Sequence, residues 1–201
     1  MIRVLIAEDQ AMVRGALASL LGLEDDIEVV AEVDRGDRVL AAAQRTRPDV
    51  ALLDIEMPGL DGISAAGELA RELPDTRTLI LTTFGRPGYM RRALAEGASG
   101  FLLKDAPSTE LAAAIRAVVE GRPAIDPALA AAAITEGDSP LTPREHEVLA
   151  AASSHETASE IAAELHLSEG TVRNYLSAAI RKLGVRNRRE AIDVAKGKGW
   201  L

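Results

Sequence analysis

The stretch Asp49–Gly59 has the sequence Asp-Val-Ala-Leu-Leu-Asp-Ile-Glu-Met-Pro-Gly and organises the first part of the chain. Its short apolar run, Val50 to Leu53, predicts a buried β-strand. The run stops at a single carboxylate, Asp54, and a Pro-Gly turn follows at Pro58. Open α/β sheets bind ligands at the carboxyl ends of their strands. Asp54 is therefore a candidate functional residue, although an isolated Asp after a strand is more often a helix cap or a turn residue.

The composition predicts a chain that can bury a core but has few specialised side chains. Of its 201 residues 47% are hydrophobic and only 2% are aromatic, so the core is expected to consist of Leu, Val, Ile and Ala. The absence of cysteine excludes a disulfide framework and a thiolate metal site. The apolar N-terminus is too short for a signal peptide, and no apolar stretch approaches the ~20 residues that span a membrane. We therefore expect a cytoplasmic protein without membrane insertion.

The net charge of −8 is unevenly distributed along the chain. Residues 1–138 carry 14 basic and 23 acidic side chains, whereas residues 168–201 carry 8 basic and 3 acidic ones. An acidic front and a basic end predict two modules with different partners.

Short apolar runs alternate with segments of helical periodicity over residues 1–121. The predicted strands are residues 2–7, 27–33, 50–53, 78–83 and 100–103. The predicted helices are residues 10–22, 38–47, 61–72, 87–96 and 107–120. This alternation predicts an α/β fold, a doubly wound (βα)5 parallel sheet with helices on both faces.

Polar side chains gather where these strands end, and together they suit phosphoryl transfer. Glu8 and Asp9 follow the first strand, Thr82 ends the fourth and Lys104 follows the fifth. Two or three carboxylates can hold one Mg²⁺ ion. Phosphoryl transfer needs an in-line nucleophile, a metal ion and a cation near the phosphoryl oxygens. With these residues at neighbouring strand ends, Asp54 is the predicted phosphoacceptor. Glu8 and Asp9 are predicted to anchor the metal ion. Lys104 is predicted to neutralise the phosphoryl group, and Thr82 to form a hydrogen bond with it.

Four motifs carry this arrangement, in this order and at strand ends: Ala7-Glu8-Asp9-Gln10, Asp54-Ile55-Glu56-Met57-Pro58-Gly59, Leu81-Thr82-Thr83 and Leu102-Leu103-Lys104-Asp105. With them, residues 1–121 resemble the receiver domain of bacterial two-component response regulators. The resemblance implies a flavodoxin-like sheet of strand order 2-1-3-4-5. It implies that a histidine kinase phosphorylates Asp54, and that the backbone carbonyl of Glu56 joins the Mg²⁺ ligands. It also implies that Phe101 turns inward when Thr82 moves toward the phosphoryl group.

A linker and a second module follow the receiver-like segment. Residues 122–139 contain Pro123 and Pro127 and are predicted to be a tether with one short helix near 128–134. Residues 140–201 contain four helix-start signals, at Thr142, Thr157, Ser168 and Asn187; three of them are followed by Glu as in a capping box. The short turn before Ser168 joins two helices as in a helix-turn-helix, which predicts a small all-α DNA-binding domain.

The predicted helix from Ser168 to Leu183 has a polar face suited to DNA. Arg can bond guanine and Asn adenine bidentately, and recognition helices use their N-terminal part for bases. The predicted base contacts are Arg173, Asn174 and Ser177. The basic residues further along are better placed for phosphates, which supply affinity without reading sequence. These are Lys182, Arg186, Arg188 and Arg189.

The motifs Leu141-Thr142-Pro143-Arg144-Glu145, Thr171-Val172-Arg173-Asn174-Tyr175 and Lys182-Leu183-Gly184-Val185 give the second module its resemblance. It is similar to the LuxR-type helix-turn-helix of NarL/FixJ response regulators. The resemblance implies double-stranded DNA as a partner and a homodimer when phosphorylated. The implied interface is formed by the helices near 10–22 and 107–120, with candidates Leu20, Leu111 and Arg116.

Two further runs, Leu81-Thr82-Thr83-Phe84 and Arg86-Pro87-Gly88-Tyr89, resemble one branch of that family. The branch is paired with a membrane-embedded histidine kinase. It implies control of membrane-lipid genes.

We predict a phosphorylation-controlled transcription regulator and not an enzyme, and two alternatives stay open. One is an atypical regulator that binds DNA independently of phosphorylation; the intact set at the strand ends argues against it. The other is a phosphohydrolase with an aspartyl nucleophile, in which Glu56 would be the general acid–base. The DNA-binding module has no place in that second alternative.

Overall fold

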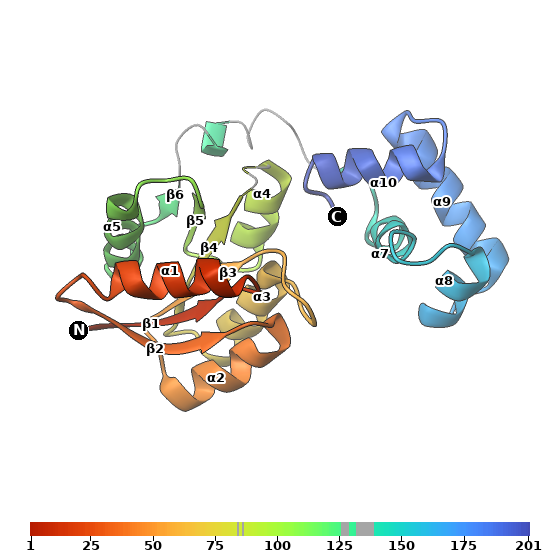
Figure 1. Ribbon diagram of the computed structural model, residues 1–201. Helices are drawn as coiled ribbons and strands as arrows, with labels where there is room; N and C mark the ends of the chain where they lie inside the picture. The colour runs from red at the N-terminus through yellow and green to blue at the C-terminus, as the bar shows by residue number, and fades with distance from the viewer. Residues whose placement is uncertain (84, 86, 126–128, 132–138) are drawn as a thin grey trace. The chain divides into compact units, whose positions relative to one another are not determined.

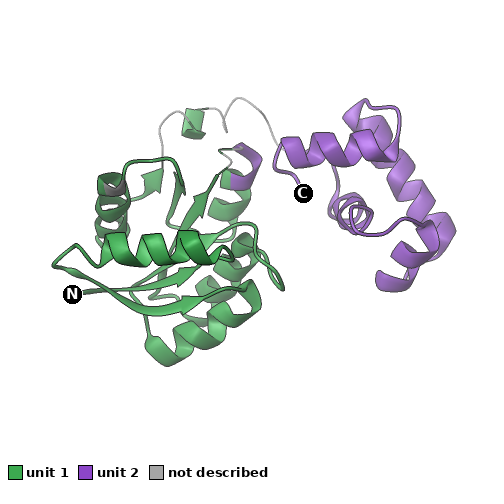
Figure 2. Cartoon of the chain, viewed as in Figure 1, with its two compact units in different colours: residues 1–85, 90–132 green, residues 86–89, 133–201 purple. Residues whose placement is uncertain are grey.

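The computed structural model describes residues 1–83, 85, 87–125, 129–131 and 139–201. The chain forms two compact units, residues 1–85 with 90–132 and residues 86–89 with 133–201 (Figure 2). The predicted boundaries of the linker, at 122 and 139, stay a prediction. Across the described ranges, no helix is both long and apolar enough to cross a membrane.

The first unit is built on a parallel sheet with the strand order β2-β1-β3-β4-β5-β6 (Figure 1). The strands are β1 (Ile2–Ala7), β2 (Ile27–Val33), β3 (Val50–Asp54), β4 (Arg77–Thr82), β5 (Gly100–Leu103) and β6 (Ala124–Ile125). The first five strands confirm the predicted doubly wound fold and its order. All five residues of β3 are buried, because a parallel sheet covered on both faces needs apolar side chains on both sides.

The sixth strand corrects the prediction of five. Ala124 and Ile125 lie in the predicted linker, yet they pair in parallel with Gly100 and Phe101 of β5. Two residues are too few to form a detectable alternation. Gly100 permits the close approach, since a Cβ at that position would lie 2.7 Å from the carbonyl oxygen of Ala124. The predicted linker therefore begins as the edge strand of the sheet.

Helices cover both faces of this sheet (Figure 1). They are α1 (Ala11–Leu21), a 3₁₀ turn (Gly36–Arg38) leading into α2 (Val39–Thr46), α3 (Gly62–Glu72), α4 (Pro87–Ala95) and α5 (Ser108–Val119). Successive strand residues point to opposite faces. Val4 and Ile6 share one core cluster with Leu21 of α1 and Ile115 of α5, so these two helices cover one face. Helices α2 and α3 pack on the strands from the other.

The second unit contains α7 (Pro143–Ala151), α8 (Ala158–Glu164), α9 (Glu169–Leu183) and α10 (Arg188–Gly197). Thr142 and Thr157 form the predicted capping boxes, and the Ser168 side chain accepts from the Thr171 amide. Gly184, with φ of +67°, ends α9 in the left-handed conformation that glycine adopts without strain. The apolar residues Val148, Leu149, Ile161 and Val172 are fully buried and form the core of this unit.

Two local predictions are revised or left outside the structure. At the start of α10, the Asn187 side chain accepts from the Glu190 amide, but the Glu190 carboxylate accepts from the amide of Arg186 instead of Asn187. The capping box predicted at Asn187 is therefore shifted by one residue. Of the predicted linker helix near 128–134, residues 129–131 are helical and the remainder lies outside the described residues.

Candidate functional site

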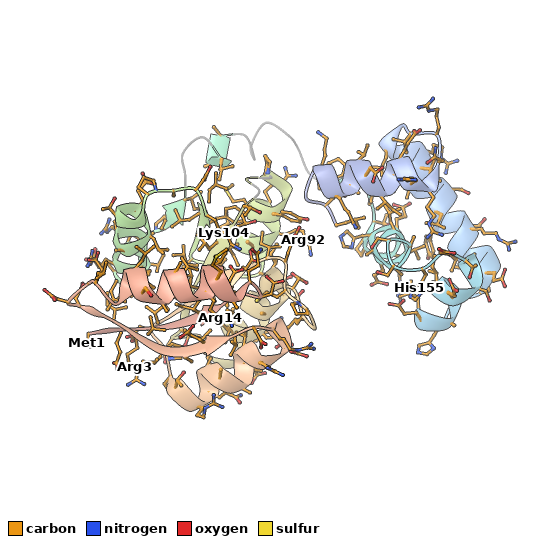
Figure 3. All side chains as sticks on the ribbon, viewed as in Figure 1. Met1, Arg3, Arg14, Arg92, Lys104 and His155 are labelled. Atoms are coloured by element: carbon orange, nitrogen blue, oxygen red, sulfur yellow. The ribbon has the colours of Figure 1, made fainter. Side chains whose placement is uncertain are left out.

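The carboxyl edge of the first sheet brings the predicted phosphoacceptor residues together. Asp54 and Thr82 are the last residues of β3 and β4, and Glu8 and Lys104 directly follow β1 and β5. The strand register aligns these ends, because Ala7 pairs with Leu53, Asp54 with Leu81 and Thr82 with Leu103. The Lys104 amide also donates to the Thr82 carbonyl at 2.8 Å. The predicted site is therefore formed by neighbouring strand ends along one edge of the sheet, where Figure 3 labels Lys104.

One cation bridges two buried carboxylates at the centre of the site. Lys104 Nζ lies 2.7 Å from Glu8 Oε2 and 3.0 Å from Asp54 Oδ1. Glu8 is 1% exposed, Asp54 5% and Thr82 2%. A lysine held this way offers its positive charge beside Asp54, where a phosphoryl group would place its negative oxygens.

Three carboxylates lie close enough to share one metal ion. Ligand oxygens of Glu8, Asp9 and Asp54 all lie within 4.8 Å of one another; Asp9 is exposed whereas the other two are buried. Carboxylate oxygens are hard donors, and Mg²⁺ takes one or two of them while keeping several waters. The donor set therefore fits Mg²⁺, with the exposed side of Asp9 open to water.

The electrostatics of the site depart from those of a surface carboxylate. Burial raises the pKa of Asp54 to about 6, partly offset by the hydrogen bond and charge of Lys104 and reinforced by the charge of Glu8. Burial by itself lowers the pKa of Lys104, but its hydrogen bonds to Glu8 and Asp54 outweigh that effect and raise it. Lys104 thus stays positively charged, whereas the ionised form of Asp54 is disfavoured because burial removes its solvation.

The loop after β3 is fixed by a glycine and a helix cap. The Gly62 amide donates to the Ile55 carbonyl at 3.0 Å, and a Cβ on Gly62 would lie 1.8 Å from the Asp54 carbonyl oxygen. Only glycine fits this approach. Asp61 is the N-cap of α3, and its side chain accepts from the amides of Ile63 and Ser64. The loop also carries Glu56, whose carbonyl stays a predicted metal ligand.

Two further residues bear on the site, one predicted and one missed. Phe101 is fully buried in β5, where it pairs with Ile80 of β4 on one side and Ile125 of β6 on the other. The residue that the sequence did not suggest is Arg14 of α1, labelled in Figure 3; its Nη1 donates to the Glu8 carbonyl at 2.6 Å. Arg14 thereby anchors the loop that presents Glu8. The available signal was an arginine one helical turn beyond that loop.

Helix α9 presents the predicted base-contacting residues on its surface. Arg173, Asn174 and Ser177 are all exposed. Arg173 Nη2 lies 2.7 Å from Glu169 Oε2, an ion pair one turn apart that solvent screens. These three side chains are free of any role in the packing of the second unit, as a readout surface requires.

The predicted phosphate contacts are placed differently from one another. The Arg186 side chain is 89% exposed and, among the described residues, forms its ion pair with Glu190, at 3.1 Å. Lys182 Nζ instead lies 2.7 Å from Oε2 of the buried Glu145. Arg188 donates to backbone carbonyls: to Glu156 at 2.9 Å, to Ala152 at 2.5 Å and also to His155. Lys182 and Arg188 are thus engaged within the protein, which the sequence alone did not indicate.

Comparison with known proteins identifies the family. Residues 4–116 match the family Response regulator receiver domain, and residues 139–195 match Bacterial regulatory proteins, luxR family. The chain belongs to the two-component response regulators. It is 50% identical to Transcriptional regulatory protein DesR of Bacillus subtilis over 203 residues, covering 100% of both chains. It is 36% identical to DNA-binding transcriptional activator DevR/DosR of Mycobacterium tuberculosis, covering 95% of this chain and 92% of the relative.

Solved structures agree with this assignment. The response regulator ChrA of a heme-sensing two-component system is 37% identical with a TM-score of 0.59, over 100% of this chain and 98% of that one. The RcsB–DNA complex is 26% identical with a TM-score of 0.66, over 98% of each chain. Response regulators that combine a receiver with a luxR-type domain, as this chain and DesR do, are transcriptional regulators, which excludes the phosphohydrolase alternative. Receiver domains generally bind Mg²⁺ at an acidic site, as the carboxylate trio described above would do.

Proposed function

We propose that a histidine kinase transfers a phosphoryl group to Asp54 of this response regulator, and that the modified protein dimerises and binds specific DNA sequences. The observation that carries the proposal is the position of Lys104, whose Nζ lies 2.7 Å from Glu8 and 3.0 Å from Asp54 at the edge of the sheet. Glu8, Asp9, Asp54 and the carbonyl of Glu56 would hold Mg²⁺, which when bound draws charge from the phosphoryl oxygens.

The phosphorylation step is tested by labelling. Acetyl phosphate with Mg²⁺, or a kinase, is expected to label the wild type and not Asp54→Asn. Asp61→Asn is the matched control, because Asp61 lies in the same loop and Asn keeps the helix cap. Persistent labelling of Asp54→Asn would end the phosphoacceptor assignment.

Dimerisation through α1 and α5 is supported by exposed apolar side chains on and beside these helices. Met12 is 86% exposed and Leu23 79%, and Leu20 and Val119 are exposed as well. Of the predicted contacts, Leu111 is wrong, because it is 6% exposed and belongs to the core. Leu20→Arg with Leu23→Arg is expected to keep the phosphorylated chain monomeric in light scattering. A variant that still dimerises would place the interface elsewhere.

Base reading is assigned to Arg173, Asn174 and Ser177 because α9 exposes all three. Arg173→Ala is expected to weaken binding to a selected duplex far more than to a random one, since a bidentate base contact contributes ~1–3 kcal/mol of discrimination. Equal losses on both duplexes would make Arg173 a phosphate contact.

The alternative of a phosphorylation-independent regulator makes a different prediction. It requires the same mass in solution and the same selected DNA with and without acetyl phosphate. Control of membrane-lipid genes and a membrane-embedded kinase stay predictions from the resemblance; transcript profiling of a deletion strain tests the first.

A further inference from the structure

Helix α7 is held at its N-terminal end by an ion pair between a buried carboxylate and a partly exposed lysine of the recognition helix. Glu145, in the first turn of α7, has a side chain only 7% exposed, and its Oε2 lies 2.7 Å from Lys182 Nζ in the last turn of α9. The same oxygen accepts from the Thr142 amide at 2.7 Å. One carboxylate oxygen therefore ties together the cap of α7 and the far end of α9.

The C-terminal end of α7 is held by Arg188, the first residue of α10. Its Nη2 donates to the carbonyls of Ala152 and His155, and its Nη1 to that of Glu156 at 2.9 Å. Ala152 is the C-cap of α7, whereas His155 and Glu156 lie in the loop that leads to α8. The last carbonyls of a helix lack partners within the helix, and a cation there satisfies a hydrogen bond and interacts favourably with the helix dipole. His155 marks this loop in Figure 3. Both ends of α7 are thus fastened by a basic residue that charge alone would assign to DNA.

The charges explain why these two cations are unsuited to phosphate. The positive charge of Lys182 and the negative charge of Glu145 cancel, so the pair is neutral as a unit. Removing Lys182 would leave Glu145 as a buried, uncompensated charge. A cation already neutralised by a buried acid releases few counterions when DNA binds. Arg188 directs its donors to the backbone. Lys182 is itself 36% exposed, but its charge is paired with Glu145, whereas the described residues contain no ion pair to its exposed neighbour Arg181 or to Arg189.

Helix α9 packs on α7 through two clusters of apolar side chains. Leu149 of α7 and Ala179 of α9 are both fully buried in one cluster, and Val148 of α7 and Val172 of α9 are both fully buried in the other. One residue along a helix corresponds to ~100° of rotation. A small rotation therefore moves Arg173 off its base edge, and polar bonds at the two ends of α7 resist it.

We propose that Glu145, Lys182 and Arg188 are positioning residues for the recognition helix, and that Arg181, Arg186 and Arg189 contact the phosphates. This rests on DNA binding through α9. The side chains of Arg173, Ser177 and Arg181 recur every four residues and so share one face of α9, whereas Lys182 is rotated away toward Glu145.

Adjacent residues supply matched controls. The full chain, treated with acetyl phosphate, is titrated with a duplex that the wild type selects from a random library and with a shuffled duplex, over ~50–200 mM salt. Arg181→Met and Arg189→Met should each lower the salt slope by about 0.9 and weaken both duplexes equally. Lys182→Met and Arg188→Met should leave the slope unchanged and weaken the selected duplex ~10-fold or more relative to the shuffled one.

Glu145→Gln is a variant for which the two roles of Lys182 predict opposite changes in DNA affinity. Circular dichroism should show that its fold is intact. We expect Glu145→Gln to weaken binding to the selected duplex without changing the salt slope. Lys182→Arg keeps a cation beside Glu145 and should therefore retain the selective binding that Lys182→Met loses. If Lys182 contacts phosphate, releasing it from Glu145 would instead tighten both duplexes, and Lys182→Met would lower the slope as Arg181→Met does. Either result overturns the proposal. Equal losses for Arg173→Ala would overturn base reading alone, and a wild type that binds neither duplex overturns both.

Discussion

Replacing Asp54 by Asn is expected to stabilise the metal-free, unphosphorylated receiver. The pKa of Asp54 rises from its ordinary 3.8 to about 6 because the carboxylate is buried, with the charge of Glu8 adding to the effect. A raised pKa means that the folded state binds the proton more tightly than the unfolded state does. The ionised group therefore destabilises the fold, and this effect grows as the pH rises from about 4 to 6 and is complete above 6.

The magnitude follows from the two pKa values. At ~1.4 kcal/mol per pKa unit, a rise from 3.8 to about 6 corresponds to ~3 kcal/mol at pH 7. Asn removes the charge and still accepts a hydrogen bond from Lys104, so most of this energy should be recovered. With a urea m-value of ~1–3 kcal/mol/M, the unfolding midpoint of the receiver should rise by roughly 1–3 M.

The assay is urea unfolding in EDTA, followed by far-UV circular dichroism. The chain has one tryptophan, Trp200, which is partly buried and packs against a core cluster of the second unit, so its fluorescence reports that unit as an internal control. The midpoint should rise at pH 7 but not at about pH 4, where Asp54 is largely protonated in the wild type. Excess Mg²⁺ should narrow the difference in urea midpoint between the wild type and Asp54→Asn, because Mg²⁺ binds the folded wild type more tightly than the folded variant. An Asp54→Asn variant that is no more stable at pH 7, or equally stabilised at pH 4, would refute the reasoning.

Three other predictions concern single contacts. Lys104→Met leaves two buried carboxylates without their cation and should lower receiver stability by up to ~3–5 kcal/mol in urea unfolding; an unchanged midpoint would contradict the bridge. Gly100→Ala places a Cβ 2.7 Å from the Ala124 carbonyl oxygen, so β6 amides should exchange faster with deuterium; unchanged exchange would show that β6 tolerates the contact. The pKa of Glu145 is lowered, since its hydrogen bonds to Lys182 and the cap outweigh burial, which raises it. Its stabilisation is therefore present above pH ~4.5 and lost as the pH falls through the lower folded pKa, which tryptophan fluorescence should report in the wild type and not in Glu145→Gln.

The receiver site was predictable because its information is local. Each strand is a short apolar run with a breaker beyond it, and each functional residue stands directly at such a boundary. The parallel topology then brings Glu8, Asp54 and Lys104 together without further information, because consecutive crossovers place all carboxyl ends at one edge. The same reasoning fails for β6, whose two residues become a strand only because Gly100 admits them.

The second module shows where local information stops. Its helix starts were predictable from Thr142, Thr157 and Ser168, since a cap and its partner lie three residues apart. The partners of Lys182 and Arg188 lie about 30 or more residues away in the chain, and nothing near either side chain in sequence distinguishes it from its exposed neighbour. A sequence supplies the sign of a charge, whereas its partner depends on how the helices pack.

The buried carboxylates of the two units differ in how fully they are neutralised. As a result, protonation of Asp54 and of Glu145 should have opposite effects on the stability of their units. In the receiver, two buried carboxylates share one cation, so an excess negative charge remains that protonation or a metal ion relieves. In the second unit the buried Glu145 has a cation of its own, so protonation removes a favourable interaction. As the pH falls from 7 toward 4, Asp54 should therefore favour folding of the receiver, whereas Glu145 should begin to disfavour folding of the second unit. The excess charge is also what lets the receiver respond to metal and phosphoryl groups, and a fully paired site would gain little from either.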